Sequence, residues 1–166
     1  MIDHVGRSRG ECYMSGKVAI IIGSKSDIAA AEKAESVLGE FGIPFETMVI
    51  SAHRTPNRIK KFALAAENSG FSVIIAIAGL AAHLPGVIAS MTALPVIGVP
   101  ADSGPLNGHD ALFSIVQMPS GIPVACVGIG NATNAALLAV EILGCTDKKV
   151  REKIREYRKR FGDDEA

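Results

Sequence analysis

The stretch Lys17–Phe41, KVAIIIGSKSDIAAAEKAESVLGEF, decides the fold. It begins with an apolar run, passes through a polar loop that opens with glycine, and continues in a pattern typical of a helix. A near-continuous run of valine and isoleucine is typical of a parallel strand that is covered on both faces. The stretch therefore predicts a strand, a loop and a crossover helix.

The same alternation continues along the chain. Strand-like runs occupy 17–22, 45–50, 73–78, 95–99 and 123–127, and they begin 28, 28, 22 and 28 residues apart. These spacings leave room for crossover helices and are too long for hairpins. Helical patterns occupy 28–41, 56–69, 84–91, 110–116, 131–143 and 147–161. We therefore predict an α/β fold of three layers (α/β/α), with a doubly wound, flavodoxin-like parallel sheet of about five strands and an added C-terminal helix.

Helix ends carry clear signals. Asp27 is expected to cap the helix that begins at Ile28, and Thr55, followed by proline, is expected to cap the next one. In the last helix, Val150, Ile154, Tyr157 and Phe161 form one apolar stripe. We expect that stripe to pack on the body of the protein or on a sister subunit, rather than to belong to an RNA-binding arm.

Length and composition predict one domain. The 166 residues have a mass of 17.3 kDa and are 48% hydrophobic, enough for a sizeable core and against intrinsic disorder. Residues 1–16 lack the apolar segment of a signal peptide, so we expect a flexible leader there. The domain is then expected to span 17–166, including the C-terminal helix.

Charge and cysteine content exclude several classes of protein. Seventeen basic side chains balance seventeen acidic ones and tryptophan is absent, which argues against nucleic-acid binding. No apolar run has the length of a membrane span. Cys12, Cys126 and Cys145 are odd in number and lack CxxC spacing, so we expect neither a disulfide framework nor a metal site. The expected protein is soluble and cytoplasmic.

The loops that follow the predicted strands contain most of the unusual residues. They are GSKSD (23–27), SAHRTP (51–56), GLAAHLPG (79–86) and DSGPLNGH (102–109). The carboxyl ends of parallel strands lie at one edge of the sheet, where ligands of such folds bind. These loops therefore predict a shared site.

Two of these loops suit a phosphorylated ligand. The hydroxyls of Ser24 and Ser26 precede a helix, as phosphate-binding groups commonly do, although ordinary capping by Ser26 and Asp27 is an alternative. Asp27 would repel phosphate and suits ribose hydroxyls better. His53 and Arg54 pair a candidate base with a bidentate phosphate ligand; a surface histidine beside a solvated arginine is the alternative. His83 stands among apolar residues, where a structural role is more common than a catalytic one.

The segments GSKSD (23–27), SAHRTP (51–56), AAHLPG (81–86) and SIVQMPSGIPV (114–124) resemble the PurE family of purine biosynthesis. The resemblance covers roughly 18–161 and is closest to class I. It implies an isomerase, a 5-(carboxyamino)imidazole ribonucleotide (N5-CAIR) mutase that moves a carboxylate from the exocyclic amine to C4 of the imidazole and yields CAIR. It further implies a homo-octamer that acts on a small ribonucleotide. Together with the charge, cysteine and hydropathy patterns, we expect no cofactor, metal, nucleic-acid or membrane partner.

The resemblance also implies residue roles. His53 corresponds to the general acid/base of the family. Nine positions are implied to bind substrate: Ser24, Ser26, Asp27, Ser51, Arg54, Gly79, Leu80, Ala81 and His83. Leu80 stands where the family usually has glycine, which would be costly if that position requires a positive φ.

Two other functions are weighed against the mutase. One is the carboxylation of aminoimidazole ribonucleotide (AIR) by free carbon dioxide, the class II reaction. The other is a non-catalytic nucleotide-binding module; a flavin-binding version is disfavoured because stacking residues are scarce.

Overall fold

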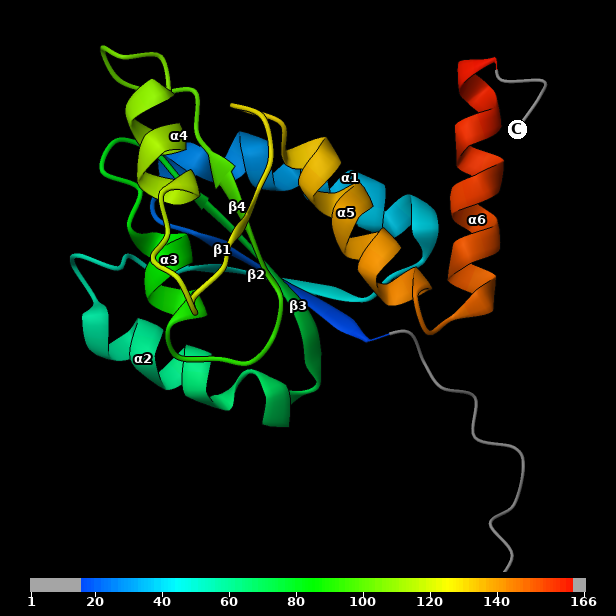
Figure 1. The fold of residues 1–166 in the computed structure, drawn as a ribbon, viewed down its shortest axis with the longest axis horizontal. Helices are drawn as coiled ribbons and strands as arrows, with labels where there is room; N and C mark the ends of the chain where they lie inside the picture. The colour runs from blue at the N-terminus through cyan, green and yellow to red at the C-terminus, as the bar shows by residue number, and fades with distance from the viewer. Residues whose placement is uncertain (1–15, 163–166) are drawn as a thin grey trace, which may run out of the picture.

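The computed structural model describes residues 16–162 and contains one parallel sheet in the order β2-β1-β3-β4-β5 (Figure 1). The strands are β1 (Lys17–Ile22), β2 (Phe45–Val49), β3 (Phe71–Ala78), β4 (Val96–Pro100) and β5 (Ala125–Cys126). The helices are α1 (Ile28–Phe41), α2 (Pro56–Ala65), α3 (Leu84–Ala89), α4 (His109–Val116), α5 (Ala132–Gly144) and α6 (Lys148–Arg158). Single 3-10 turns occupy Lys25–Asp27, Glu67–Ser69 and Lys159–Phe161. The predicted fold class and strand order are confirmed, whereas the leader predicted for 1–16 lies, except for Gly16, outside the described residues.

The alternation of side chains in β1 explains the three layers. Val18, Ile20 and Ile22 enter one core with α1, α5 and α6. Ala19 and Ile21 enter the other core with α2, α3 and α4. Since both faces of the central strands are buried, nearly every position is apolar, apart from Lys17 and Ser72 near the strand starts.

The two edge strands differ from the prediction. β5 contains only two residues, which pair with Ile97 and Gly98, and Pro123 at the start of the predicted run has no N–H to donate to a ladder. β2 is an edge strand whose Phe45 and Val49 are exposed, so it is not covered on both faces as predicted. Both strands were predicted from apolar runs, which do not reveal how many residues of a strand pair or how much of it is exposed.

Two predicted helix caps are wrong in detail. Asp27 makes no side-chain bond to α1; its Oδ2 instead accepts a hydrogen bond from the Ser24 N–H, at 3.1 Å. Thr55 likewise does not cap α2, because its hydroxyl donates to the Ser51 carbonyl at 2.9 Å. Asp27 instead completes a capping box with Ser24 at the 3-10 turn Lys25–Asp27, which leads directly into α1. The Thr55 hydroxyl holds its own loop together and leaves the start of α2 without a side-chain cap.

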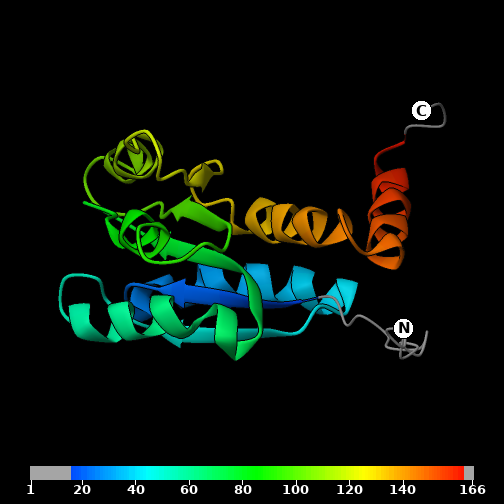
Figure 2. The same ribbon diagram turned by 60° about the horizontal axis from the view of Figure 1, so that its bottom comes forward.

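Helix α6 packs on the body at the end away from the arrowheads of β1 (Figures 1 and 2). Val150 and Ile154 are buried, and the Tyr157 ring lies 5.4 Å from the ring of Phe41. Lys153 Nζ donates to the carbonyl oxygen of Phe41, the last residue of α1, at 2.6 Å. The apolar stripe therefore packs on the body as predicted, apart from Phe161, which is 71% exposed.

No helix within 16–162 combines the length and the apolar character needed to cross a membrane.

Candidate functional site

A cavity of about 420 Å³ opens at the carboxyl edge of the sheet. It is formed by the loops that follow β1, β2 and β3, with Ser103 from the loop after β4. β1 and β3 are neighbours although they are not consecutive in the chain, so the cavity lies at the point where the strand order reverses. Ligands of doubly wound sheets bind at this topological position.

The loop after β1 is organised around Asp27. The carboxylate accepts hydrogen bonds from the Ser24 N–H and, at 3.3 Å, from the Ser26 hydroxyl. Burial raises the pKa of Asp27 above its ordinary value, and the bonds from Ser24 and Ser26 partly oppose that shift. Both serines and the aspartate thus line the cavity in a fixed arrangement.

Arg54 joins two of these loops. Its Nη2 donates to the Gly23 carbonyl at 3.1 Å, and its Nε donates to the Ser51 hydroxyl at 3.3 Å. A guanidinium has five N–H donors, so these two bonds orient the group and leave further donors for a ligand. Ser51 is therefore a residue that positions Arg54 as well as a lining residue.

His53 and His83 are in direct contact. Nε2 of His53 lies 2.6 Å from Nδ1 of His83, and the ring planes meet at 84°. A neutral imidazole has one donor and one acceptor nitrogen, so one ring must donate and the other must accept. When His53 Nε2–H donates, His53 Nδ1 is unprotonated and His83 carries its proton on Nε2. When His83 Nδ1–H donates instead, His83 Nε2 is unprotonated and His53 carries its proton on Nδ1. In either state the neutral pair has one basic nitrogen and one N–H outside the shared bond.

The loop after β3 has an unusual backbone. The Ala82 N–H donates to the Gly79 carbonyl at 3.1 Å, which closes a turn. Leu80, the first central residue of that turn, has a φ of 54°, and Ala82 has a φ of 24°. The positive φ that was in question at Leu80 is therefore present.

The structure gathers nearly all of the predicted site residues. Nine of them line the cavity: Ser24, Ser26, Asp27, Ser51, His53, Arg54, Gly79, Leu80 and His83. Ala81 does not line it and is exposed, because the turn directs this residue outward. The cavity has six lining residues beyond the predicted set: Gly23, Ala52, Ala78, Ala82, Leu84 and Ser103. Ser103 belongs to the fourth polar loop, and its position after β4 was the available sequence signal.

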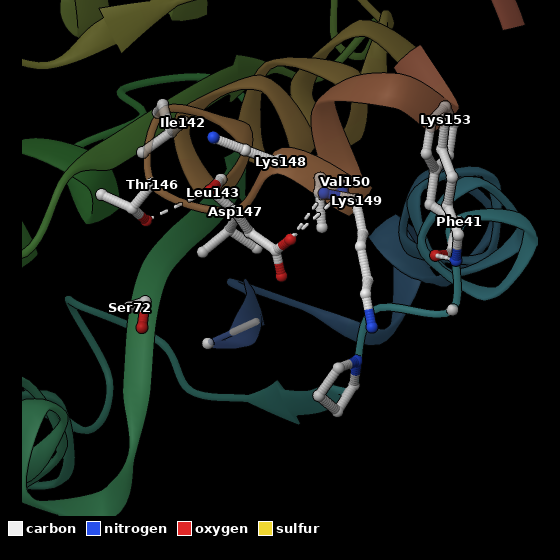
Figure 3. A pocket seen from close by; sticks show the side chains of 13 residues that line it. Phe41, Ser72, Ile142, Leu143, Thr146, Asp147, Lys148, Lys149, Val150 and Lys153 are labelled. Atoms are coloured by element: carbon white, nitrogen blue, oxygen red, sulfur yellow. Dashed lines mark hydrogen bonds between the residues drawn. The ribbon is translucent and has the colours of Figure 1, made fainter. Parts of the chain in front are cut away.

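A larger cavity, of about 890 Å³, lies beside the start of α6 (Figure 3). Two of its charged side chains already serve the fold: Asp147 Oδ1 accepts from the Lys149 and Val150 N–H groups, and Lys153 Nζ donates to the Phe41 carbonyl. It contains no histidine, whereas the smaller cavity contains two. The smaller cavity is therefore the better candidate for acid–base chemistry. Within the described part of the chain, no three His, Cys, Asp or Glu side chains gather as a metal site requires.

Residues 17–164 match the family model described as AIR carboxylase. The chain belongs to the AIR carboxylase family. A relative from Pyrococcus horikoshii, named N5-carboxyaminoimidazole ribonucleotide mutase, is 60% identical over 142 residues, which are 86% of this chain and 80% of the relative. A protein of the same name from Thermotoga maritima is 54% identical over 145 residues, covering 87% and 85%.

A solved structure supports the family assignment at the level of the fold. The crystal structure of Treponema denticola PurE aligns with a TM-score of 0.77 and 33% identity, covering 86% of this chain and 89% of that one. The PurE resemblance noted from the loop motifs is thereby confirmed.

Proposed function

We propose that this member of the AIR carboxylase family is an N5-CAIR mutase, an isomerase of purine biosynthesis. The observation that carries the proposal is the presence of a histidine pair and an oriented arginine in one cavity of about 420 Å³. The two relatives cited above, which share most of their length with this chain, bear the mutase name.

Substrate binding follows from the polar groups of the loops. Arg54, held by Gly23 and Ser51, is the ligand for the phosphate, together with the hydroxyls of Ser24 and Ser26. Asp27 accepts hydrogen bonds from the ribose hydroxyls. These contacts place the imidazole ring of the substrate toward the two histidines.

His53 transfers the proton in both halves of the reaction. Its imidazolium first protonates the exocyclic nitrogen while the bond from that nitrogen to the carboxylate carbon breaks, which releases carbon dioxide inside the cavity. C4 of the ring then attacks carbon dioxide, and neutral His53 removes the proton from C4. One proton is given and one is taken, so the reaction is an isomerisation that consumes neither bicarbonate nor a cofactor.

His83 positions His53 for this cycle. With His53 Nε2–H donating to His83 Nδ1, the proton that cycles is carried on Nδ1 of His53. The shared bond then stays unchanged through both halves of the reaction. An imidazole that is held in one orientation is already placed for proton transfer, which is the advantage of a preorganised base.

Carboxylation of AIR is the second candidate, favoured by the description of the matching family model. A paired assay distinguishes the two reactions. One sample receives N5-CAIR without bicarbonate, the other receives AIR with abundant bicarbonate, and both are followed by the ultraviolet absorbance of CAIR. The proposal expects turnover mainly in the first sample. Turnover only in the second would make the protein a carboxylase, and turnover in neither would leave a binding module.

The assembly and location of the protein form part of the same proposal. We propose a homo-octamer, by resemblance to the PurE family, acting in the cytoplasm. Phe113 and Val116 on α4 are 61% and 51% exposed, which is compatible with burial against other subunits. Cys126 and Cys145 form no disulfide within residues 16–162, which suits a reducing compartment.

A further inference from the structure

We infer that the hydroxyl of Ser103 binds the carboxylate of CAIR, and that the absence of a side chain at Gly79 makes room for this hydroxyl. The inference rests on the ribonucleotide site proposed above and adds a residue to it. CAIR carries a carboxylate on C4 of its ring, whereas AIR carries hydrogen there. A side chain that contacts the carboxylate therefore lets the cavity distinguish these two ribonucleotides.

The first observation is the place of Ser103 in the order of the sheet. The groups proposed to bind phosphate follow β1 and β2, whereas Ser103 follows β4. β3 separates β4 from β1, so the two loops are two strand spacings apart, about 10 Å. A ribonucleotide whose phosphate lies over β1 and β2 extends its ring toward β3 and β4. Ser103 thus enters the cavity from the side on which the ring and its carboxylate lie.

The second observation is the empty space above Gly79, the residue that follows β3. A Cβ built on Gly79 would lie 2.3 Å from Oγ of Ser103, so the hydroxyl occupies the place of a side chain at position 79. The backbone of Gly79 does not itself require glycine, because its φ lies outside the left-handed region, unlike the φ of 75° at Gly104. The close approach of the Ser103 hydroxyl therefore explains the glycine.

The third observation is that the Ser103 hydroxyl is available to a ligand. The other serine hydroxyls of the cavity already make hydrogen bonds within the protein, namely those of Ser24, Ser26 and Ser51. Within residues 16–162 no group of the chain makes such a bond to the Ser103 hydroxyl, and the proposed contacts with phosphate and ribose do not use it. A hydroxyl that donates to a carboxylate makes a charge-assisted hydrogen bond, about twice as strong as a neutral one.

The test measures the dissociation constants of CAIR and AIR by isothermal titration calorimetry. Ser103→Ala removes the hydroxyl at an exposed loop position, which the fold should tolerate. This variant should bind CAIR about tenfold more weakly or worse, and its affinity for AIR should change by no more than about twofold. Ser26→Ala is the matched control, because its hydroxyl is proposed to bind the phosphate that both ribonucleotides carry. It should weaken the binding of both by the same factor.

Gly79→Ala tests whether the glycine acts through Ser103. The added Cβ displaces the Ser103 hydroxyl, so the affinity for CAIR should fall as it does in Ser103→Ala. In the double variant that hydroxyl is absent, and the Cβ of residue 103 would lie 3.6 Å from the new Cβ, an ordinary contact. The double variant should therefore bind CAIR as weakly as Ser103→Ala alone, and no more weakly.

Three outcomes would overturn the inference. Equal losses for CAIR and AIR in Ser103→Ala, or a loss for neither, would show that Ser103 does not bind the carboxylate. Additive losses in the double variant would show that Gly79 does not make room for the hydroxyl. Failure of the mutase function is a separate result: a protein that binds both ribonucleotides as expected but forms no CAIR from N5-CAIR would overturn that function and support the role of Ser103.

Discussion

Single residues at the carboxyl edge depend on their neighbours for their orientation. Arg54 is oriented by Gly23 and Ser51, and His53 is oriented by His83. The motif SAHRTP predicted that His53 and Arg54 would be close, since they are adjacent in the chain. The contact between His53 and His83 was not predicted, because 30 positions separate them and the side-chain rotamers, not the spacing of the loops, bring the two rings together.

Asp27 provides a prediction about pH. Burial raises its pKa, so the folded protein holds that proton more tightly than the unfolded chain does. The resulting stabilisation is complete below the unfolded pKa and is lost as pH rises through the folded pKa. Asp27→Asn removes a partly buried charge, so the free energy of unfolding should rise relative to the unaltered protein at about pH 7 and match it more closely at about pH 4. Urea denaturation at both values checks this, and a loss of stability near neutral pH would contradict it.

The helices and strands that form the core were largely predictable from the sequence, whereas the edge strands and the helix caps were not. β1 and α1 begin and end at the predicted residues, because the spacing of their apolar residues identifies each element and a glycine directly follows each one. Gly42, with a φ of 69°, is the left-handed residue that ends α1. β5 and the caps at Asp27 and Thr55 were predicted less well, since strand pairing and the competing loop hydrogen bonds depend on residues distant in the sequence.

Gly98 in β4 provides a prediction about packing. A Cβ there would lie 2.4 Å from Cγ2 of Ile115 on α4 and 3.3 Å from Cβ of Pro85 on α3. Gly98→Ala should therefore lower the free energy of unfolding by about 1–3 kcal/mol, because the helices must move. Gly39→Ala on α1 is the control: a Cβ at that position would meet nothing within 4 Å, so the helix should gain about 0.5–1 kcal/mol. Equal effects of the two substitutions in urea denaturation would contradict this explanation.

At the scale of the whole molecule, the candidate site and helix α6 lie at opposite ends of the sheet. The carboxyl ends of the strands carry the candidate site, while α6 and the larger cavity lie at the other end (Figures 2 and 3). The sequence predicted the end that carries the candidate site, because the loops that leave the strands contain most of the unusual residues. It did not reveal that the cavity of the candidate site would be the smaller of the two.

Assembly provides a prediction at this scale. Light scattering coupled to size-exclusion chromatography should give a mass of eight times the 17.3 kDa of one chain, because the resemblance implies an octamer and apolar side chains on α4 are exposed. A mass that stays at that of a single chain across concentrations would contradict it.

The most direct measurement compares turnover and ligand binding for His53→Asn. If His53 transfers the proton at the carboxyl edge, kcat for N5-CAIR should fall by about 10²–10⁴-fold. The dissociation constant for CAIR should change only a few-fold, because Arg54, Ser24 and Ser26 are retained. His109→Asn, an exposed histidine outside the cavity, is the control and should behave as the unaltered protein. Turnover by His53→Asn within about tenfold of the unaltered protein would contradict the assignment of His53 as the acid and base of this site.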